Sequence, residues 1–147
     1  MTTIISGFSG IYRSPNSQTL ENVVIFDCSG YSHTPDGEPN PEFPGNYVSA
    51  LELAIKDNPD KIYLVSYLRE VRNELYGRGM KYIIVLPAQH RRNEYMIRWI
   101  GKGSDIEFMH DMYYQWYHLI SDCQQDVSPI IWLDTEEFLE DILPKNF

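Results

Sequence analysis

Short runs of apolar and mostly β-branched residues recur along the chain and predict five strands. Each run is continuously apolar rather than alternating, which is typical of strands that are covered on both faces in a parallel sheet. The runs are TTIIS (2–6), NVVIF (22–26), KIYLVS (61–66), KYIIVLP (81–87) and SPIIWL (128–133).

Helical patterns lie between most of these runs. Apolar residues at spacings of three and four predict helices in NYVSALELAIKD (46–57) and in YLREVRNELYGRG (67–79), the second ending at Gly77 or Gly79. The stretch 90–123 predicts two helices separated by GKGSD, with Ser104 or Asp105 capping the second. The segment DTEEFLEDIL (134–143) predicts a last helix, capped by Asp134 or Thr135.

Strands that alternate with helices of this length indicate βαβ units. We therefore predict one domain over residues 1–147, with a three-layer α/β/α fold and a mainly parallel five-stranded sheet. The exception to the alternation is YSHTPDGEPNPEFPGN (31–46), which is rich in Pro, Gly and Asn. It predicts a long surface loop, and such loops in compact domains are often functional.

The charge of the chain restricts its partners. The 147 residues carry a formal net charge of −9, which argues against binding nucleic acid through a broad basic surface. A small anionic ligand is compatible with this charge only if the few cations gather in one cleft. No apolar stretch is long enough to span a membrane and no signal peptide opens the chain, so we expect a cytoplasmic protein. Cys28 and Cys123 lack metal-ligand spacing and are expected to be free thiols.

The stretch GFSGIYRS (7–14) has the layout of a phosphate-binding P-loop, G-x-x-x-x-G-K-[ST], directly after a predicted strand. Gly7, Gly10, Arg13 and Ser14 occupy four useful places for binding phosphate. Tyr12 stands at the second glycine of the pattern, and Arg13 stands at its lysine. The alternative is an ordinary turn that contains glycines.

Two other features could carry chemistry. Asp27 follows a predicted strand at its carboxyl end, where open α/β sheets place ligands, so it could contact a substrate or a metal-bound water. Its alternative role is a turn or helix cap. The region 88–105 concentrates cations, with Arg91 and Arg98 seven residues apart. It could form a lid over a polyphosphate, or a solvated helix face that pairs with Glu94.

The aromatic stretch FMHDMYYQWYHLI (108–120) is expected to pack mainly in the core. Phe108, Met112 and Trp116 recur near helical spacing and would face the sheet. The tyrosines between them would point partly outward, where they could form a surface for a protein partner.

Several segments together resemble the small P-loop kinase-like proteins of bacteriophages, which are similar to adenylate and other nucleoside monophosphate kinases. They are the P-loop region, FDCS (26–29), NPEFPGNY (40–47), VSYLREVRNELYGRGMKYIIVLP (65–87), NEYMIRWIGKG (93–103) and the tryptophan-containing helix after it. These segments cover most of the chain in the same order.

The resemblance implies ATP and Mg²⁺ as cofactors and assigns roles to particular residues. Gly7, Gly10, Arg13 and Ser14 would face the phosphates, with Tyr12 in the same loop and with Ser14 holding Mg²⁺. Asp27 would lie near the acceptor nucleotide, and Arg98 would act from the lid. Arg13, Asp27 and Arg98 are thus the predicted catalytic residues.

The chain departs from this family where the site would use its residues. The departures are Tyr12, Arg13, Ser29 in place of a second acid, and Tyr67 and Leu68 in place of Ser and His. Our leading hypothesis is therefore an impaired kinase-like protein that acts as an accessory to a host or phage protein and could still bind nucleotide. The alternatives are an active (deoxy)nucleoside monophosphate kinase and a nucleotide sensor without turnover.

Overall fold

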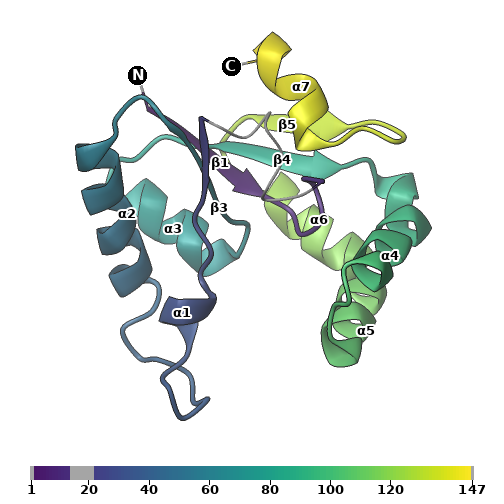
Figure 1. Cartoon of the computed structure of the whole chain (residues 1–147), viewed down its shortest axis with the longest axis horizontal. Coiled ribbons are helices and arrows are strands. Elements are labelled where there is room, and N and C mark those ends of the chain that lie inside the picture. The colour runs from purple at the N-terminus through teal and green to yellow at the C-terminus, as the bar shows by residue number, and fades with distance from the viewer. Residues whose placement is uncertain (1, 14–21, 147) are drawn as a thin grey trace.

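A computed structural model describes residues 2–13 and 22–146 of the chain. All five predicted strands are present and form one fully parallel sheet in the order β2-β3-β1-β4-β5 (Figure 1). The strands are β1 (Thr3–Gly7), β2 (Val23–Ile25), β3 (Ile62–Ser66), β4 (Ile83–Pro87) and β5 (Ile130–Leu133). The first strand therefore lies at the centre of the sheet, and its carboxyl end leads into the glycine-containing loop.

Helices complete a three-layer α/β/α fold, as predicted. In Figure 1, α7 lies on the opposite side of the sheet from α3 and α6, and the α4–α5 pair projects beyond the carboxyl end of β4. The helices are α1 (Ser29–Ser32), α2 (Gly45–Asp57), α3 (Arg69–Gly77), α4 (Arg92–Gly101), α5 (Ile106–Tyr114), α6 (Trp116–Gln124) and α7 (Leu139–Asn146).

The region predicted as two helices forms three. The break at GKGSD is confirmed, and the Asp105 side chain caps α5 by accepting a hydrogen bond from the Phe108 amide at 3.4 Å. A second break at Gln115 separates α5 from α6 and was not predicted. Directly after this break, Trp116 is fully buried and its indole N–H donates to the Gln89 carbonyl at 2.8 Å.

The start predicted for the last helix is wrong. Residues 134–138 form a turn instead, in which the Glu137 amide donates to the Asp134 carbonyl at 2.9 Å. Glu136 has a φ of 67°, which is incompatible with a helix. The helix begins at Leu139, where the Asp141 carboxylate reaches back to accept a hydrogen bond from the Phe138 amide at 2.8 Å.

Large aromatic side chains fill the core beneath the glycine-containing loop. Phe8, Tyr95, Trp99 and Trp116 are all at most 1% exposed. The Phe8 ring lies edge-on to Trp116 with centroids 5.3 Å apart, a favourable arrangement for aromatic pairs. Met112 and Trp116 are buried as predicted, whereas Phe108 is 37% exposed. The loop after β1 therefore packs on buried aromatic side chains.

Candidate functional site

A cavity of about 650 Å³ lies at the carboxyl ends of β1, β2 and β3. Open parallel sheets bind ligands at this edge, next to the point where the strand order changes direction. Its wall combines the loop after β1, the segment after β2, the end of β3 and the α4–α5 turn. Of the predicted site residues, Gly7, Gly10, Tyr12 and Asp27 line the cavity.

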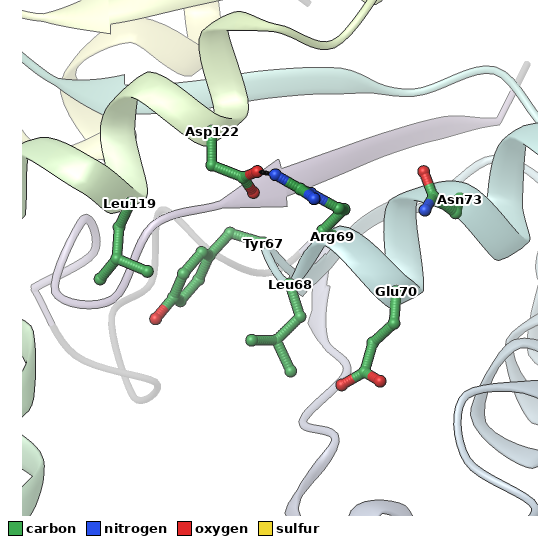
Figure 2. Close-up of a pocket in the computed structure, with 7 residues that line it drawn as sticks. All are labelled: Tyr67, Leu68, Arg69, Glu70, Asn73, Leu119 and Asp122. Atoms are coloured by element: carbon green, nitrogen blue, oxygen red, sulfur yellow. Dashed lines mark hydrogen bonds and ion pairs between the residues drawn. The ribbon is translucent and has the colours of Figure 1, made fainter. Parts of the chain in front are cut away.

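Other cavities lie beside this one and at the opposite edge of the sheet. One of about 390 Å³ shares Tyr67 and Leu68 with the first and is bounded by the Arg69–Asp122 ion pair (Figure 2). Another of about 840 Å³ lies at the amino ends of β1 and β4, between Tyr76 and Val127. The 650 Å³ cavity is the better candidate because the strand ends bring residues from separate elements together there.

Several aromatic residues lie around the cavity. Phe8 and Tyr67 lie with ring centroids 5.0 Å apart, and Trp99 and Phe108 meet edge-to-face at 5.9 Å. Burial raises the pKa of Tyr67 to about 12, so this phenol stays neutral. Among these rings, Asp27, Lys102 and a few hydroxyl and thiol groups supply the polar contacts.

The two loop glycines are required by packing against the protein itself. A Cβ at Gly7 would lie 2.6 Å from methyl groups of both Ile11 and Leu64. Gly10 has a φ of +93°, and a Cβ there would lie 3.0 Å from the indole nitrogen of Trp99. The glycines predicted to let a phosphate approach thus let apolar and aromatic side chains approach the loop.

Carbonyl groups of the loop accept hydrogen bonds from cationic and indole side chains at the C-terminal end of α4. Trp99 Nε1 donates to the Ser9 carbonyl at 3.3 Å, and the Arg98 guanidinium donates to the Gly10 carbonyl at 2.9 Å. Lys102 Nζ donates to the Tyr12 carbonyl at 3.0 Å. A phosphate cradle is formed by amide N–H groups that converge on one point; in this loop the Phe8 amide donates to the Val85 carbonyl at 3.2 Å and the Arg13 amide donates to Glu140.

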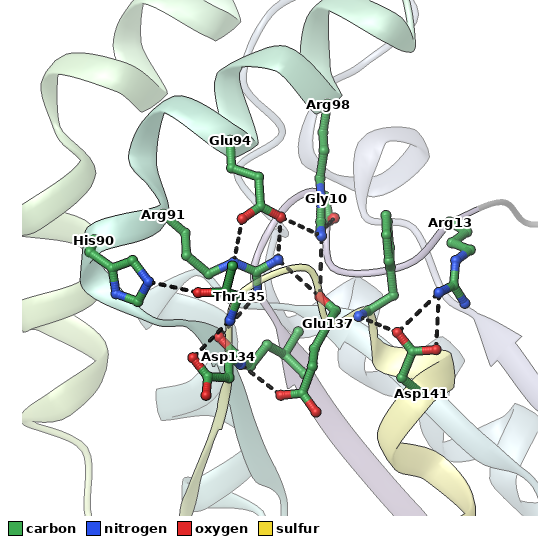
Figure 3. A network of polar contacts seen from close by, with 12 residues as sticks. Gly10, Arg13, His90, Arg91, Glu94, Arg98, Asp134, Thr135, Glu137 and Asp141 are labelled. Atoms are coloured by element: carbon green, nitrogen blue, oxygen red, sulfur yellow. Dashed lines mark hydrogen bonds and ion pairs between the residues drawn. The ribbon is translucent and has the colours of Figure 1, made fainter.

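Arg13 turns away from the cavity toward the first turn of α7. Its amide donates to Glu140 Oε2 at 2.8 Å, and its guanidinium pairs with Asp141 at 3.0 Å (Figure 3). The guanidinium also lies 4.5 Å from the ring centroid of Phe138. Ser14, predicted to bind phosphate and Mg²⁺, lies outside the described residues.

Arg98 and Arg91 share Glu94, which is the pairing that the sequence offered as the alternative to a lid. Arg98 contacts Glu94 at 2.9 Å and Arg91 forms an ion pair with the same carboxylate (Figure 3). Hydrogen bonding from Arg91 lowers the pKa of Glu94 below its ordinary value. The Arg91 side chain is 0% exposed, so this face is buried rather than solvated. Neither arginine lines the cavity.

Lys102 is the cation that does line the cavity, in the described part of the chain. Its Nζ lies 4.6 Å from the Tyr12 ring centroid. Burial lowers its pKa from the ordinary value, and the nearby Arg98 lowers it further. Lys102 lies within the cation-rich region 88–105, but local patterns could not pair it with Tyr12, because the two residues are 90 positions apart in the chain.

Asp27 makes the turn contacts that the sequence offered as its alternative role. Its carboxylate accepts hydrogen bonds from the Ser29 amide at 3.3 Å and the Ser29 hydroxyl at 2.6 Å. It remains exposed, so a ligand can still reach it. The side chain is therefore held in place by the next turn while it lines the cavity.

The remaining expectations from the sequence concern metal binding, the two cysteines and membrane spanning. No group of three or more His, Cys, Asp or Glu side chains in it is arranged to hold a metal ion. Cys28 and Cys123 are free thiols, as predicted. None of the helices in the described ranges is both long and apolar enough to cross a membrane.

Comparisons of the chain with protein-family models, with curated proteins and with solved structures find no match.

Proposed function

We propose that the protein is a catalytically inactive relative of the small P-loop nucleotide kinases of bacteriophages. In this proposal it acts as an accessory protein whose cavity at the carboxyl ends of β1, β2 and β3 binds a nucleoside or a nucleoside monophosphate. The parallel α/β fold and the position of the cavity are compatible with this family.

The observation that carries the loss of catalysis is the way in which the loop after β1 is bonded to α4 and α7. The carbonyls of Ser9, Gly10 and Tyr12 are engaged by donors from α4 and Lys102. The cation expected to neutralise the phosphates, Arg13, is paired with Asp141. Phosphoryl transfer depends on positioned cations and amides around the transferring group, and here the guanidinium and the amide of Arg13 are bonded to Asp141 and Glu140.

The ligand class follows from the wall of the cavity. A volume of about 650 Å³ is within the usual range for small-molecule sites. The partly exposed rings of Tyr67 and Phe108 suit stacking or edge contact with a nucleobase, and the buried ring of Phe8 packs against Tyr67. Asp27 can accept hydrogen bonds from sugar hydroxyls, and Lys102 supplies one positive charge, which suits a single phosphate better than a polyphosphate.

An accessory role is supported by apolar side chains on the surface of α4 and α5. Ile97, Ile100, Ile106 and Tyr114 are between 57% and 78% exposed. Exposed apolar groups that gather on neighbouring elements are typical of contact surfaces. We propose a host or phage protein as the partner, with no membrane and no broad contact with nucleic acid.

Calorimetry with the full chain tests the ligand class. The four common nucleosides, their monophosphates and ATP are titrated with and without Mg²⁺. We expect one nucleoside and its monophosphate to bind, and ATP to bind no better than the monophosphate whether or not Mg²⁺ is present. Phe108→Ala should weaken binding, whereas Ile106→Ala on the same helix should not, because Ile106 does not line the cavity.

An active nucleoside monophosphate kinase is the second candidate. It is favoured by the presence of an acid, Asp27, and a cation, Lys102, in the same cavity. A radiolabelled phosphoryl-transfer assay with ATP·Mg²⁺ separates the two candidates. Transfer that disappears in Lys102→Met would establish the enzyme and exclude the inactive relative.

A further inference from the structure

Arg72 is a buried arginine that lies outside the candidate cavity. It is one turn into α3, and its side chain is 3% exposed. Its two terminal nitrogens bond the carboxylates of Asp122 and Asp126, each at 2.8 Å. Because charges are costly to remove from water, a buried ion pair generally adds little net stability. A role besides stability therefore has to be considered for this group.

The third donor of the Arg72 guanidinium reaches the wall of the cavity. Arg72 Nε donates to the Tyr67 carbonyl at 2.9 Å. Tyr67 and Leu68 are the whole connection between the end of β3 and the start of α3, and both residues line the cavity. Arg72 thus ties this short connection to α6 and to the segment that follows α6.

The two acids that hold Arg72 have further partners of their own. Asp126 accepts a hydrogen bond from the Tyr82 hydroxyl at 2.7 Å, and Asp122 also pairs with Arg69 (Figure 2). A planar guanidinium holds several acceptors in fixed directions, which an ammonium group cannot do. The Tyr67 carbonyl is therefore held by a donor whose own position is fixed.

The side chain of Tyr67 has weaker contacts than its main chain. Its ring lies 5.0 Å from the Phe8 ring, measured between centroids, and its hydroxyl contacts the Met112 sulfur at 3.2 Å. A thioether is a weak acceptor, whereas a hydrogen bond from a guanidinium is strengthened by its charge. The bond from Arg72 is thus the strongest polar contact of this residue.

We propose that Arg72 is a positioning residue for the cavity. Its bond to the Tyr67 carbonyl fixes the place of the Tyr67 ring, against which the base of a nucleoside or nucleoside monophosphate lies. This inference rests on the proposed function, because the base is the group that we assign to this ring. It adds that the contribution of the base to affinity depends on Arg72, whereas the contributions of sugar and phosphate do not.

Arg72→Lys tests this role, because it keeps a positive charge beside the two aspartates but lacks the planar set of donors. Arg78→Lys is the matched control. Arg78 directly follows α3, pairs with Glu74 at 2.7 Å and donates to the Gly45 carbonyl at 3.1 Å. It thus also joins an acid to a main-chain carbonyl, but none of these three residues lines the cavity.

NMR titrations measure the affinity for the four common ribonucleosides, for their monophosphates and for ribose 5-phosphate, which has no base. Without ligand, the ring resonances of Tyr67 report its position. The ¹⁵N–¹H resonance of the Leu68 amide reports the bond from Arg72, because this amide shares a peptide group with the Tyr67 carbonyl. Thermal unfolding shows whether each variant is folded.

We expect Arg72→Lys to weaken the tightest base-containing ligand of the wild type by about three- to tenfold, the size of one aromatic contact. The affinity for ribose 5-phosphate should stay within about twofold. The Tyr67 and Leu68 resonances should shift in Arg72→Lys, and Arg78→Lys should behave as the wild type. If Arg72→Lys does not fold, Asp126→Asn decides the question, because it keeps the shape of a side chain that holds Arg72 and removes its charge. It should shift the same resonances and weaken the same ligand.

Two results would overturn the inference. One is a folded Arg72→Lys protein in which the Tyr67 resonances or the affinity for the base-containing ligand are unchanged. The other is equal weakening of that ligand and of ribose 5-phosphate, which a general loosening of the fold would produce. In both cases the wild type binds its ligand, so the proposed function stands. A wild type that binds none of the nucleosides or monophosphates would instead overturn the proposed function, and this inference with it.

Discussion

Gly10 and Trp99 are in contact across 89 residues of sequence: a Cβ built on Gly10 would lie 3.0 Å from the indole Nε1. The same indole N–H donates to the Ser9 carbonyl at 3.3 Å. The loop after β1 is therefore shaped around a tryptophan of α4, and its positive φ of +93° at Gly10 allows that approach.

This contact predicts an unequal effect of two glycine substitutions. Gly10→Ala should lower the free energy of unfolding by about 2–3 kcal/mol, since it adds a clash to a strained backbone. Gly37→Ala is the matched control, because Gly37 has a similar φ of +83° with nothing within 4 Å of its Cβ position. Urea unfolding measures both, and equal losses would show that Trp99 does not constrain Gly10.

Glu94, the one acid of α4, is predicted to contribute to stability through its arginine partners. Glu94→Gln leaves Arg91, whose side chain is fully buried, without its carboxylate partner. Because Glu94 itself is about one-third exposed, we expect a loss of about 2 kcal/mol, less than for a fully buried pair. Glu107→Gln, an exposed acid on α5, should change the free energy of unfolding by less than about 0.5 kcal/mol. A loss no larger than this in Glu94→Gln would contradict the prediction.

The pKa of Glu94 predicts how stability changes with acid. Hydrogen bonding from Arg91 lowers this pKa in the folded protein relative to the ordinary value of 4.5. The unfolded chain therefore takes up the proton first, so the stabilisation is complete above pH 4.5 and is lost as the pH falls through the folded-state pKa. Urea unfolding between pH 7 and pH 3 should show a shallower decline for Glu94→Gln than for the wild type. Equal declines in the two proteins would show that Glu94 does not contribute to the loss of stability in acid.

Local sequence patterns were sufficient for the sheet and for most helices. Continuous apolar runs identified all five strands, because a strand buried on both faces needs no alternation. They could not locate the break at Gln115, since the apolar positions of the aromatic stretch continue at helical spacing across it. Nor could they place the start of α7, where acidic residues before Leu139 imitate a helix cap.

Only part of the candidate site could be predicted from the sequence, because its decisive contacts join residues that are far apart in the chain. The Arg13–Glu140 hydrogen bond spans 127 residues and the Lys102–Tyr12 contact spans 90. A pattern of glycines shows where a loop can bend, but it does not show whether amides or carbonyls point inward. Glu140 was therefore missed, and Arg13 was assigned to a phosphate.

Lys102 should separate the binding of nucleoside from that of its monophosphate. If its ammonium contacts the phosphate, Lys102→Met should weaken monophosphate binding about tenfold or more and leave the nucleoside affinity within about twofold. Lys81→Met is the matched control, because Lys81 lines the cavity at the opposite edge of the sheet. Calorimetry with the nucleoside and monophosphate that bind the wild type measures both effects. Equal weakening of the two ligands would instead show that Lys102 acts by holding Tyr12, whose carbonyl accepts its hydrogen bond at 3.0 Å. Lys102 would then not be the cation that binds the phosphate.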